Sequence, residues 1–199
     1  MSCLRQAGAG ITKQFYVLRM SSSVHIINSS SLSPDELEHV SRSVEAIIGA
    51  RVHRSHLRVE LERAFDSSRG QYNSSVLLAQ LLSLKQSLPG KIIALVDVDL
   101  YVPVLTFVYG EAQLEGAAAI VSTHRLHNSF YGVDENRPLL IERVEKEIVH
   151  ELGHTFGLFH CHQFECVMRS STYVEEIDFK KATMCKECEG VLYRKVRGS

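Results

Sequence analysis

The sequence predicts a single compact α/β domain with a mixed, twisted sheet, followed by a small C-terminal part rich in metal-binding side chains. Three observations support this class. Short β-branched runs alternate with longer segments in which apolar residues recur at helical spacing. The 199 residues are 45% hydrophobic and 23% charged, which is ordinary for one globular domain. Four of the five cysteines lie after residue 160, close to several histidines.

The first predicted elements are a strand over residues 24–27 and a helix over residues 33–48. Ser33 is placed to cap the helix N-terminus, Pro34 suits the first helical position, and Glu36 completes a capping box. Apolar residues then recur at the spacing of one helix face: Leu37, Val40, Val44 and Ile47.

The middle of the chain predicts two strands around a second helix. Residues 51–62 alternate enough to predict a strand, and the polar stretch 66–75 predicts a loop. Apolar residues at helical spacing predict a helix over 76–88. The β-branched run 92–98 predicts a strand buried within the sheet.

The last predicted elements surround the metal-binding residues. Residues 117–122 predict a shorter strand at the sheet edge. Residues 138–158 predict a long helix, and residues 173–181 predict a short one between the two cysteine pairs. If residues 115–123 form an exposed edge beside a metal cleft, an extended peptide could bind to them by backbone hydrogen bonds. An ordinary packed strand is the alternative for this segment.

Residues 150–160 read HELGHTFGLFH, which is the HExxHxxGxxH pattern of a catalytic zinc site. His150 and His154 are four residues apart on a helix, so both imidazoles can reach one metal. Glu151 is placed to act as general base on a metal-bound water. Gly157 can take the left-handed conformation that ends the helix and brings His160 round as third ligand. Three protein ligands leave the fourth position open for water, as catalytic zinc requires.

The second metal-binding pattern begins at the next residue. Cys161 and Cys166 form a C-x4-C pair, and Cys185 and Cys188 form a C-x2-C pair. Two such pairs separated by a short segment are typical of a four-cysteine zinc site. Two disulfides, or a redox-active C-x2-C pair, are the alternatives. A closed four-cysteine site would be structural and would help to fold the C-terminal segment.

Charge and hydropathy exclude several classes of partner. The 22 basic and 23 acidic residues nearly cancel, so no strong field attracts nucleic acid or anionic lipid. Every apolar run is far shorter than the roughly 20 residues that span a bilayer. The N-terminus has no apolar core of signal-peptide length. We therefore expect no nucleic-acid or membrane partner, and a cytoplasmic protein, where free thiolates persist.

The run HELGHTFGLFHCHQFECVM followed by CKEC resembles the archaemetzincins, which are metzincin-like zinc metallopeptidases. Residues 96–103, 107–112 and 122–126 are similar to the same family, and the likeness covers roughly residues 22–190. It implies a single metzincin-like domain over residues 22–199, after a flexible extension at residues 1–21. It further implies a catalytic zinc on residues 150–160 and a second, structural zinc on residues 161–188.

The resemblance also assigns roles to individual residues. The catalytic zinc would be held by His150, His154 and His160, and Glu151 would serve as general base and acid. The structural zinc would be held by Cys161, Cys166, Cys185 and Cys188. Met168 would occupy the Met-turn, a packing position beneath the metal; an ordinary core methionine is the alternative.

The predicted function is hydrolysis of peptide bonds by a zinc-activated water. Zinc would lower the pKa of its bound water to about 7, and Glu151 would transfer the proton to the leaving amine. Four side chains are candidate donors to the transition-state oxyanion: Tyr173, Tyr131, His124 and His127. The expected substrate is a peptide or protein, and the expected state is a monomer. Two alternatives stay open, namely a catalytically silent peptide- or protein-binding module and a zinc hydrolase acting on a non-peptide amide or ester.

Overall fold

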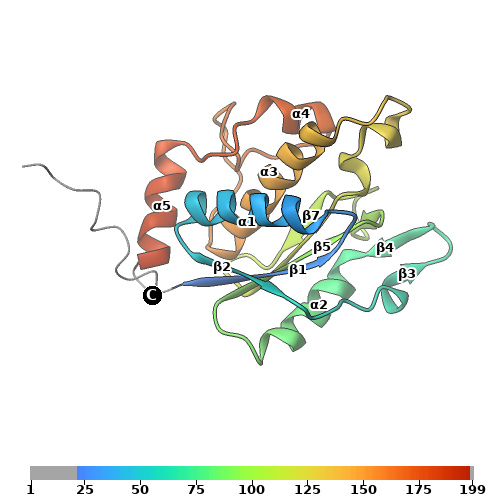
Figure 1. The fold of residues 1–199 in the computed structure, drawn as a ribbon, viewed down its shortest axis with the longest axis horizontal. Helices are drawn as coiled ribbons and strands as arrows, with labels where there is room; N and C mark the ends of the chain where they lie inside the picture. The colour runs from blue at the N-terminus through green and yellow to red at the C-terminus, as the bar shows by residue number, and fades with distance from the viewer. Residues whose placement is uncertain (1–21, 198–199) are drawn as a thin grey trace, which may run out of the picture.

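The computed structural model describes residues 22–197, in which helices cover both faces of a central sheet (Figure 1). The N-terminal extension predicted at residues 1–21 lies outside the described residues. Among residues 22–197, no helix is both long enough and apolar enough to cross a membrane.

The central sheet has five strands in the order β2-β1-β5-β8-β7. The first four strands run parallel to their neighbours, and β7 pairs antiparallel with β8, so the sheet is mixed as predicted. The strands are β1 (Ser23–Ser29), β2 (Arg51–Ser55), β5 (Lys91–Val96), β7 (Gly110–Ala112) and β8 (Ala118–Ser122).

The long helices divide between the two faces of this sheet. Helices α1 (Pro34–Ile48) and α3 (Arg137–Thr155) pack on one face, and α2 (Ser74–Lys85) packs on the other (Figure 1). A small second sheet joins β3 (Phe65–Asp66), β4 (Gln71–Asn73) and β6 (Leu100–Tyr101). Two helices follow α3, namely α4 (Val174–Phe179) and α5 (Lys186–Arg197). Short 3₁₀ turns span Glu62–Ala64, His124–Leu126 and Asn128–Tyr131.

The predicted capping of α1 is confirmed. The Ser33 hydroxyl accepts a hydrogen bond from the Glu36 backbone N–H at 3.3 Å, and the Ser33 N–H donates to the Glu36 carboxylate at 2.8 Å. Gly49 ends the helix in the left-handed region at φ 72°. The predicted buried strand is also confirmed, because β5 has five consecutive buried residues.

Several predicted boundaries were wrong. The strand predicted over residues 51–62 ends at Ser55, and the predicted polar loop 66–75 contains β4 and the first residues of α2. Asn73 caps α2 by accepting hydrogen bonds from two backbone N–H groups, so this helix begins before its apolar residues do. Helix α5 was not predicted at all. The long helix α3 ends at Thr155 rather than at residue 158.

The predicted position of the sheet edge was also wrong. The segment 115–123 forms β8, which lies between β5 and β7 and is buried along its whole length. On this side of the sheet the edge strand is β7, which is only three residues long, and β2 forms the opposite edge. The sequence of β7, Gly-Glu-Ala, lacks the β-branched residues by which a strand is recognised, and it forms because β8 offers it a backbone to pair with.

Candidate metal centre

Helix α3 carries the first part of the predicted zinc motif. Asn136 caps its N-terminus, and the last turns are buried against the sheet, so the helix is fixed before it reaches His150. At the other end, Gly157 is left-handed at φ 88°. The Gly157 N–H donates to the His154 carbonyl and the Leu158 N–H donates to the Gly153 carbonyl, which together form a Schellman motif. This stop reverses the chain and returns His160 to the helix, as predicted.

The structure brings His150, His154 and His160 together, and we call these residues the histidine triad. One ring nitrogen from each lies within 4.8 Å of the other two. The Nε2 atoms of His150 and His154 are 3.1 Å apart. The three rings therefore point at a common position between them.

Backbone carbonyls fix the orientation of the two helical histidines. His150 Nδ1 is 2.8 Å from the Val167 carbonyl, and His154 Nδ1 is 2.7 Å from the Leu158 carbonyl. A carbonyl can only accept, so each Nδ1 carries the proton and each Nε2 presents a lone pair. Burial is the main factor that lowers the pKa of all three histidines, which favours neutral rings.

This arrangement fits a metal cation. Two Nε2 lone pairs 3.1 Å apart repel each other unless a cation lies between them. Neutral imidazoles held by carbonyls through the opposite nitrogen are the usual ligands of zinc in proteins. The histidine triad thus supplies three nitrogen ligands and leaves one side of the metal position facing the cleft.

Glu151 is buried beside the triad and packs on the edge strand. A Cβ added at Gly110 would lie 2.7 Å from Glu151 Cγ and from Oε1, so only glycine on β7 leaves room for this side chain. Burial, followed by the neighbouring Glu147 carboxylate, raises the pKa of Glu151. A buried carboxyl with a raised pKa is suited to accept and return a proton.

Met168 lies against helix α3, at the place where the predicted Met-turn would lie. The side chain is fully buried. A Cβ added at Gly153 would lie 2.3 Å from Met168 Sδ, so the thioether occupies the space that this glycine leaves open between His150 and His154. The neighbouring Val167 supplies the carbonyl that holds His150. This short segment therefore supports the histidine triad from below by packing and by one hydrogen bond.

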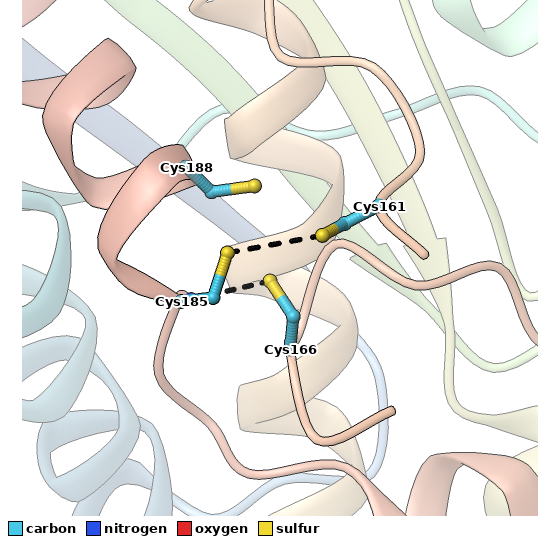
Figure 2. A group of neighbouring side chains, drawn as sticks. All are labelled: Cys161, Cys166, Cys185 and Cys188. Carbon is cyan, nitrogen blue, oxygen red and sulfur yellow. Dashed lines mark hydrogen bonds between the residues drawn. The ribbon is translucent and has the colours of Figure 1, made fainter. Parts of the chain in front are cut away.

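The four predicted cysteines also converge (Figure 2). The thiols of Cys161, Cys166, Cys185 and Cys188, here called the cysteine cluster, lie within 4.8 Å of one another, and all four are free. The first pair comes from the loop after α3, and the second comes from the start of α5. Cys161 and Cys185 are thus 24 residues apart in the sequence, yet their thiols lie close together in the structure.

The sulfur spacing argues against one of the predicted alternatives, the pair of disulfides. Cys161 Sγ and Cys185 Sγ are 3.8 Å apart, whereas a disulfide would hold them at about 2.05 Å. Four sulfurs bound at about 2.3 Å to a tetrahedral zinc would lie about 3.8 Å apart. Backbone N–H groups of Gln163 and Cys185 donate to two of the sulfurs. The Cys188 backbone N–H is the main factor that lowers the pKa of Cys185, which favours its thiolate.

A cleft of about 410 Å³ opens onto the histidine triad and Glu151. One wall consists of residues 105–112, which lead into and include β7, and another consists of residues 170–172 after the Met-turn. None of the four predicted oxyanion donors, Tyr173, Tyr131, His124 and His127, lines this cleft. The hydroxyls that do line it belong to Thr106, Tyr109 and residues 170–172.

Lys180 and Glu147 also line the cleft, and neither was predicted. Lys180 Nζ lies 3.3 Å from Glu147 Oε1 and donates to the Arg169 carbonyl at 3.1 Å. Both side chains are almost entirely buried. The one available sequence signal was the position of Glu147 one helical turn before Glu151, which places it on the same face. Nothing in the sequence pairs it with Lys180.

Comparisons with known proteins agree with this arrangement. The model of peptidase family M54 matches residues 34–194. The archaemetzincin of Pyrococcus furiosus is 33% identical over 169 residues, which cover 82% of this chain and 88% of that protein. The archaemetzincin of Methanocaldococcus jannaschii is 40% identical over 125 residues, which cover 63% and 68%.

A solved structure shows the same fold. The crystal structure of a zinc-dependent peptidase from Methanocorpusculum labreanum superimposes with a TM-score of 0.77 at 31% identity. The superposition covers 85% of this chain and 99% of that one. The overall fold of this chain is thus an arrangement that is already known.

Proposed function

Because this chain belongs to peptidase family M54, the archaemetzincins, and is a zinc metallopeptidase, we propose that its histidine triad holds the catalytic zinc and its cysteine cluster holds a second, structural zinc. The observation that carries the first assignment is the pair of Nε2 lone pairs 3.1 Å apart, with a buried carboxylate beside them. When bound there, zinc lowers the pKa of a water ligand to about 7 and polarises a substrate carbonyl.

We propose Glu151 as the general base and acid of the reaction. Its carboxylate takes one proton from the attacking water as the water oxygen bonds to the peptide carbonyl carbon. The same carboxyl then gives that proton to the amine nitrogen as the C–N bond breaks. Burial and the contact with Gly110 hold the carboxylate in one place, so it need not reorient during the reaction.

The edge strand β7 is the proposed guide for the substrate backbone. Its three residues, Gly110–Ala112, all line the cleft, and one edge of the strand faces away from β8. An extended peptide pairing with this edge would run along the cleft past Glu151. The role that the sequence suggested for residues 115–123 therefore passes to the neighbouring strand.

The cysteine cluster has a structural role in this proposal. It joins the loop that follows His160 to the start of α5, and the Cys185 N–H donates to Cys166 Sγ at 3.3 Å. The Cys161 N–H also donates to the Met168 carbonyl at 2.9 Å. A metal bound by the four sulfurs would therefore stabilise the backbone that positions the third histidine.

We further propose that the protein acts on peptides as a cytoplasmic monomer. A single chain supplies every residue of both proposed zinc sites. Four thiols held close together but unbridged are suited to a reducing compartment, where cysteines stay available to bind zinc.

Counting bound zinc by native mass spectrometry tests the two assignments separately. We expect two zinc ions per wild-type chain and one in the variant Cys185→Ser/Cys188→Ser. We also expect one zinc ion in the variant His150→Ala/His154→Ala. This second variant should also lose peptide hydrolysis. One zinc in the wild type that disappears entirely when the two cysteines are replaced would refute an independent histidine site.

A further inference from the structure

The catalytic cleft extends beyond Glu151 into a second group of polar side chains. Tyr109, Glu147, Ser171 and Lys180 all line the cleft, and we call this group the polar pocket. They come from four separate segments: the residue before β7, the helix α3, the loop before α4 and the end of α4. None of them belongs to the histidine triad, and none is Glu151, the proposed proton carrier.

Two hydroxyls in the polar pocket have no hydrogen-bond partner. Tyr109 is only 6% exposed, and its buried hydroxyl has no partner within hydrogen-bonding distance; burial, followed by the nearby Tyr131 hydroxyl, raises its pKa. The Ser171 hydroxyl is likewise buried and unpaired. Nearly all buried polar atoms in folded proteins have a hydrogen-bond partner. Two buried hydroxyls without one, beside a reaction centre, therefore point to a ligand that supplies the missing partner.

Lys180 adds a buried positive charge to the same pocket. Its ammonium has three protons to donate, and the structure accounts for two, one to Glu147 and one to the Arg169 carbonyl. Lys180 lines the same cleft as the histidine triad and Glu151, so its ammonium lies near the proposed site of bond cleavage.

The acceptors of the cleft are already engaged. Glu147 is paired with Lys180, and Glu111 accepts from the Ser75 hydroxyl at 2.9 and 3.1 Å. Glu151 is assigned to proton transfer. The two hydroxyls and one ammonium proton of the polar pocket are thus left as donors, which suits an anionic acceptor with two oxygens.

We propose that the polar pocket binds a carboxylate of the substrate next to the scissile bond, with Tyr109, Ser171 and Lys180 as its donors. The carboxylate could belong to an Asp or Glu side chain or to the C-terminus of a short peptide, and the chemistry of recognition is the same. The proposal rests on the peptidase function proposed above and specifies its substrate class.

Tyr109→Phe and Ser171→Ala are the most informative variants. Each removes a hydroxyl that makes no internal hydrogen bond, so the fold should be unaffected. Tyr72→Phe is the matched control, because Tyr72 lies in β4 and does not line the cleft.

The test uses a set of peptides that share one sequence except at the two positions flanking the cleaved bond. Either position carries Glu, Gln, Leu or Lys in turn, and each peptide is made with a free and with an amidated C-terminus. We expect the carboxylate peptides to exceed their Gln and Lys counterparts by at least about tenfold in kcat/KM. Tyr109→Phe and Ser171→Ala should each reduce that preference by about tenfold, whereas the control Tyr72→Phe should leave it unchanged. If amidating the peptide C-terminus is enough to abolish the preference, then the C-terminal carboxylate is the group that the pocket binds.

Binding to the zinc-loaded variant Glu151→Gln separates this proposal from the peptidase function. Isothermal titration with the same peptides should show the same carboxylate preference, and Tyr109→Phe in that background should reduce it. Equal affinity for all peptides, or a preference for Lys through Glu147, would overturn the proposal even if the wild type cleaves well. If the wild type cleaves no peptide but the binding preference for a carboxylate remains, only the proposed peptidase function is overturned.

Discussion

At the scale of single residues, two glycines determine how closely the catalytic side chains can be packed. Gly110 leaves room for Glu151, and Gly153 leaves room for Met168. Both contacts are too short for any side chain larger than hydrogen. The active-site geometry therefore depends on residues that carry no chemistry themselves.

The Gly110 contact gives a sharp prediction. Gly110→Ala would place a methyl group 2.7 Å from Glu151 Cγ and also 2.7 Å from the Ile120 carbonyl, which is backbone and cannot move aside cheaply. We expect the Glu151 carboxylate to shift and kcat to fall by about 100-fold, while both zinc ions stay bound. Steady-state kinetics with zinc counting checks this. Unchanged kcat would show that the Glu151 position is not critical, and Gly190→Ala is the control, because a Cβ there meets only the far end of the Arg194 side chain at 3.7 Å.

The sequence predicted which candidate metal ligands lie together, but it did not predict most of the residues that line the cleft. His150, His154 and His160 are linked by helical periodicity and one turn, so their convergence follows from local geometry. Tyr109 and Lys180 lie about 70 residues apart and meet only because the whole chain folds. Tyr173, in contrast, was a reasonable donor by proximity in sequence, but it is 67% exposed and lies outside the cleft.

At the scale of elements, the N-termini of α1 and α3 are joined by an ion pair. Arg137 binds both carboxylate oxygens of Glu36 at 2.6 Å, and it also donates to the Ser31 carbonyl at 2.8 Å. The Arg137 hydrogen bonds are the main factor that lowers the pKa of Glu36 from 4.5 to about 2. This pair fixes the start of the helix that carries the zinc ligands.

The lowered pKa predicts how stability depends on pH. The ionised form of Glu36 is stabilised only in the folded state, so its contribution is complete above about pH 4.5 and is lost as the pH falls toward 2. Glu36→Gln should therefore destabilise the protein at pH 7, by about 1 kcal/mol or less given the partial exposure of the pair. The difference from wild type should shrink between pH 5 and 3.

Urea unfolding of wild type and Glu36→Gln across that range measures the effect. The same substitution in an Arg137→Met background should show a smaller pH dependence, because only the Ser33 hydrogen bonds to the carboxylate then remain. A difference between wild type and Glu36→Gln that stays constant down to pH 3 would contradict the assignment of the lowered pKa to this pair.

Which elements were predictable depends on what stabilises each one. Helix α1 carries its own capping box and apolar face, so its sequence alone defines it. Helix α5 contains Gly190 and begins among cysteines, and its stability comes from packing Leu192 and Val196 into the core and from the cysteine cluster. Strand β7 is likewise stabilised by pairing with β8, and its own sequence does not indicate a strand. The sequence therefore predicted β8, rather than β7, as the edge strand.

At the scale of the whole molecule, the two proposed zinc sites share one connecting segment, residues 166–168. Cys166 belongs to the cysteine cluster, the Val167 carbonyl orients His150, and Met168 packs under α3. The Val167 N–H donates to the Thr183 carbonyl, just before the second cysteine pair. A small domain thus positions its catalytic histidines through a segment that the second metal would stabilise.

The most direct test of the account is peptide cleavage by wild type and by Glu151→Gln, with two zinc ions confirmed in both. A diverse peptide library analysed by mass spectrometry would show which bonds are cut. The account predicts that the wild type cleaves and that Glu151→Gln is slower by about 10³-fold or more, because its amide can neither accept nor return the proton. Equal cleavage by Glu151→Gln with both zincs bound would contradict the central role of this carboxylate.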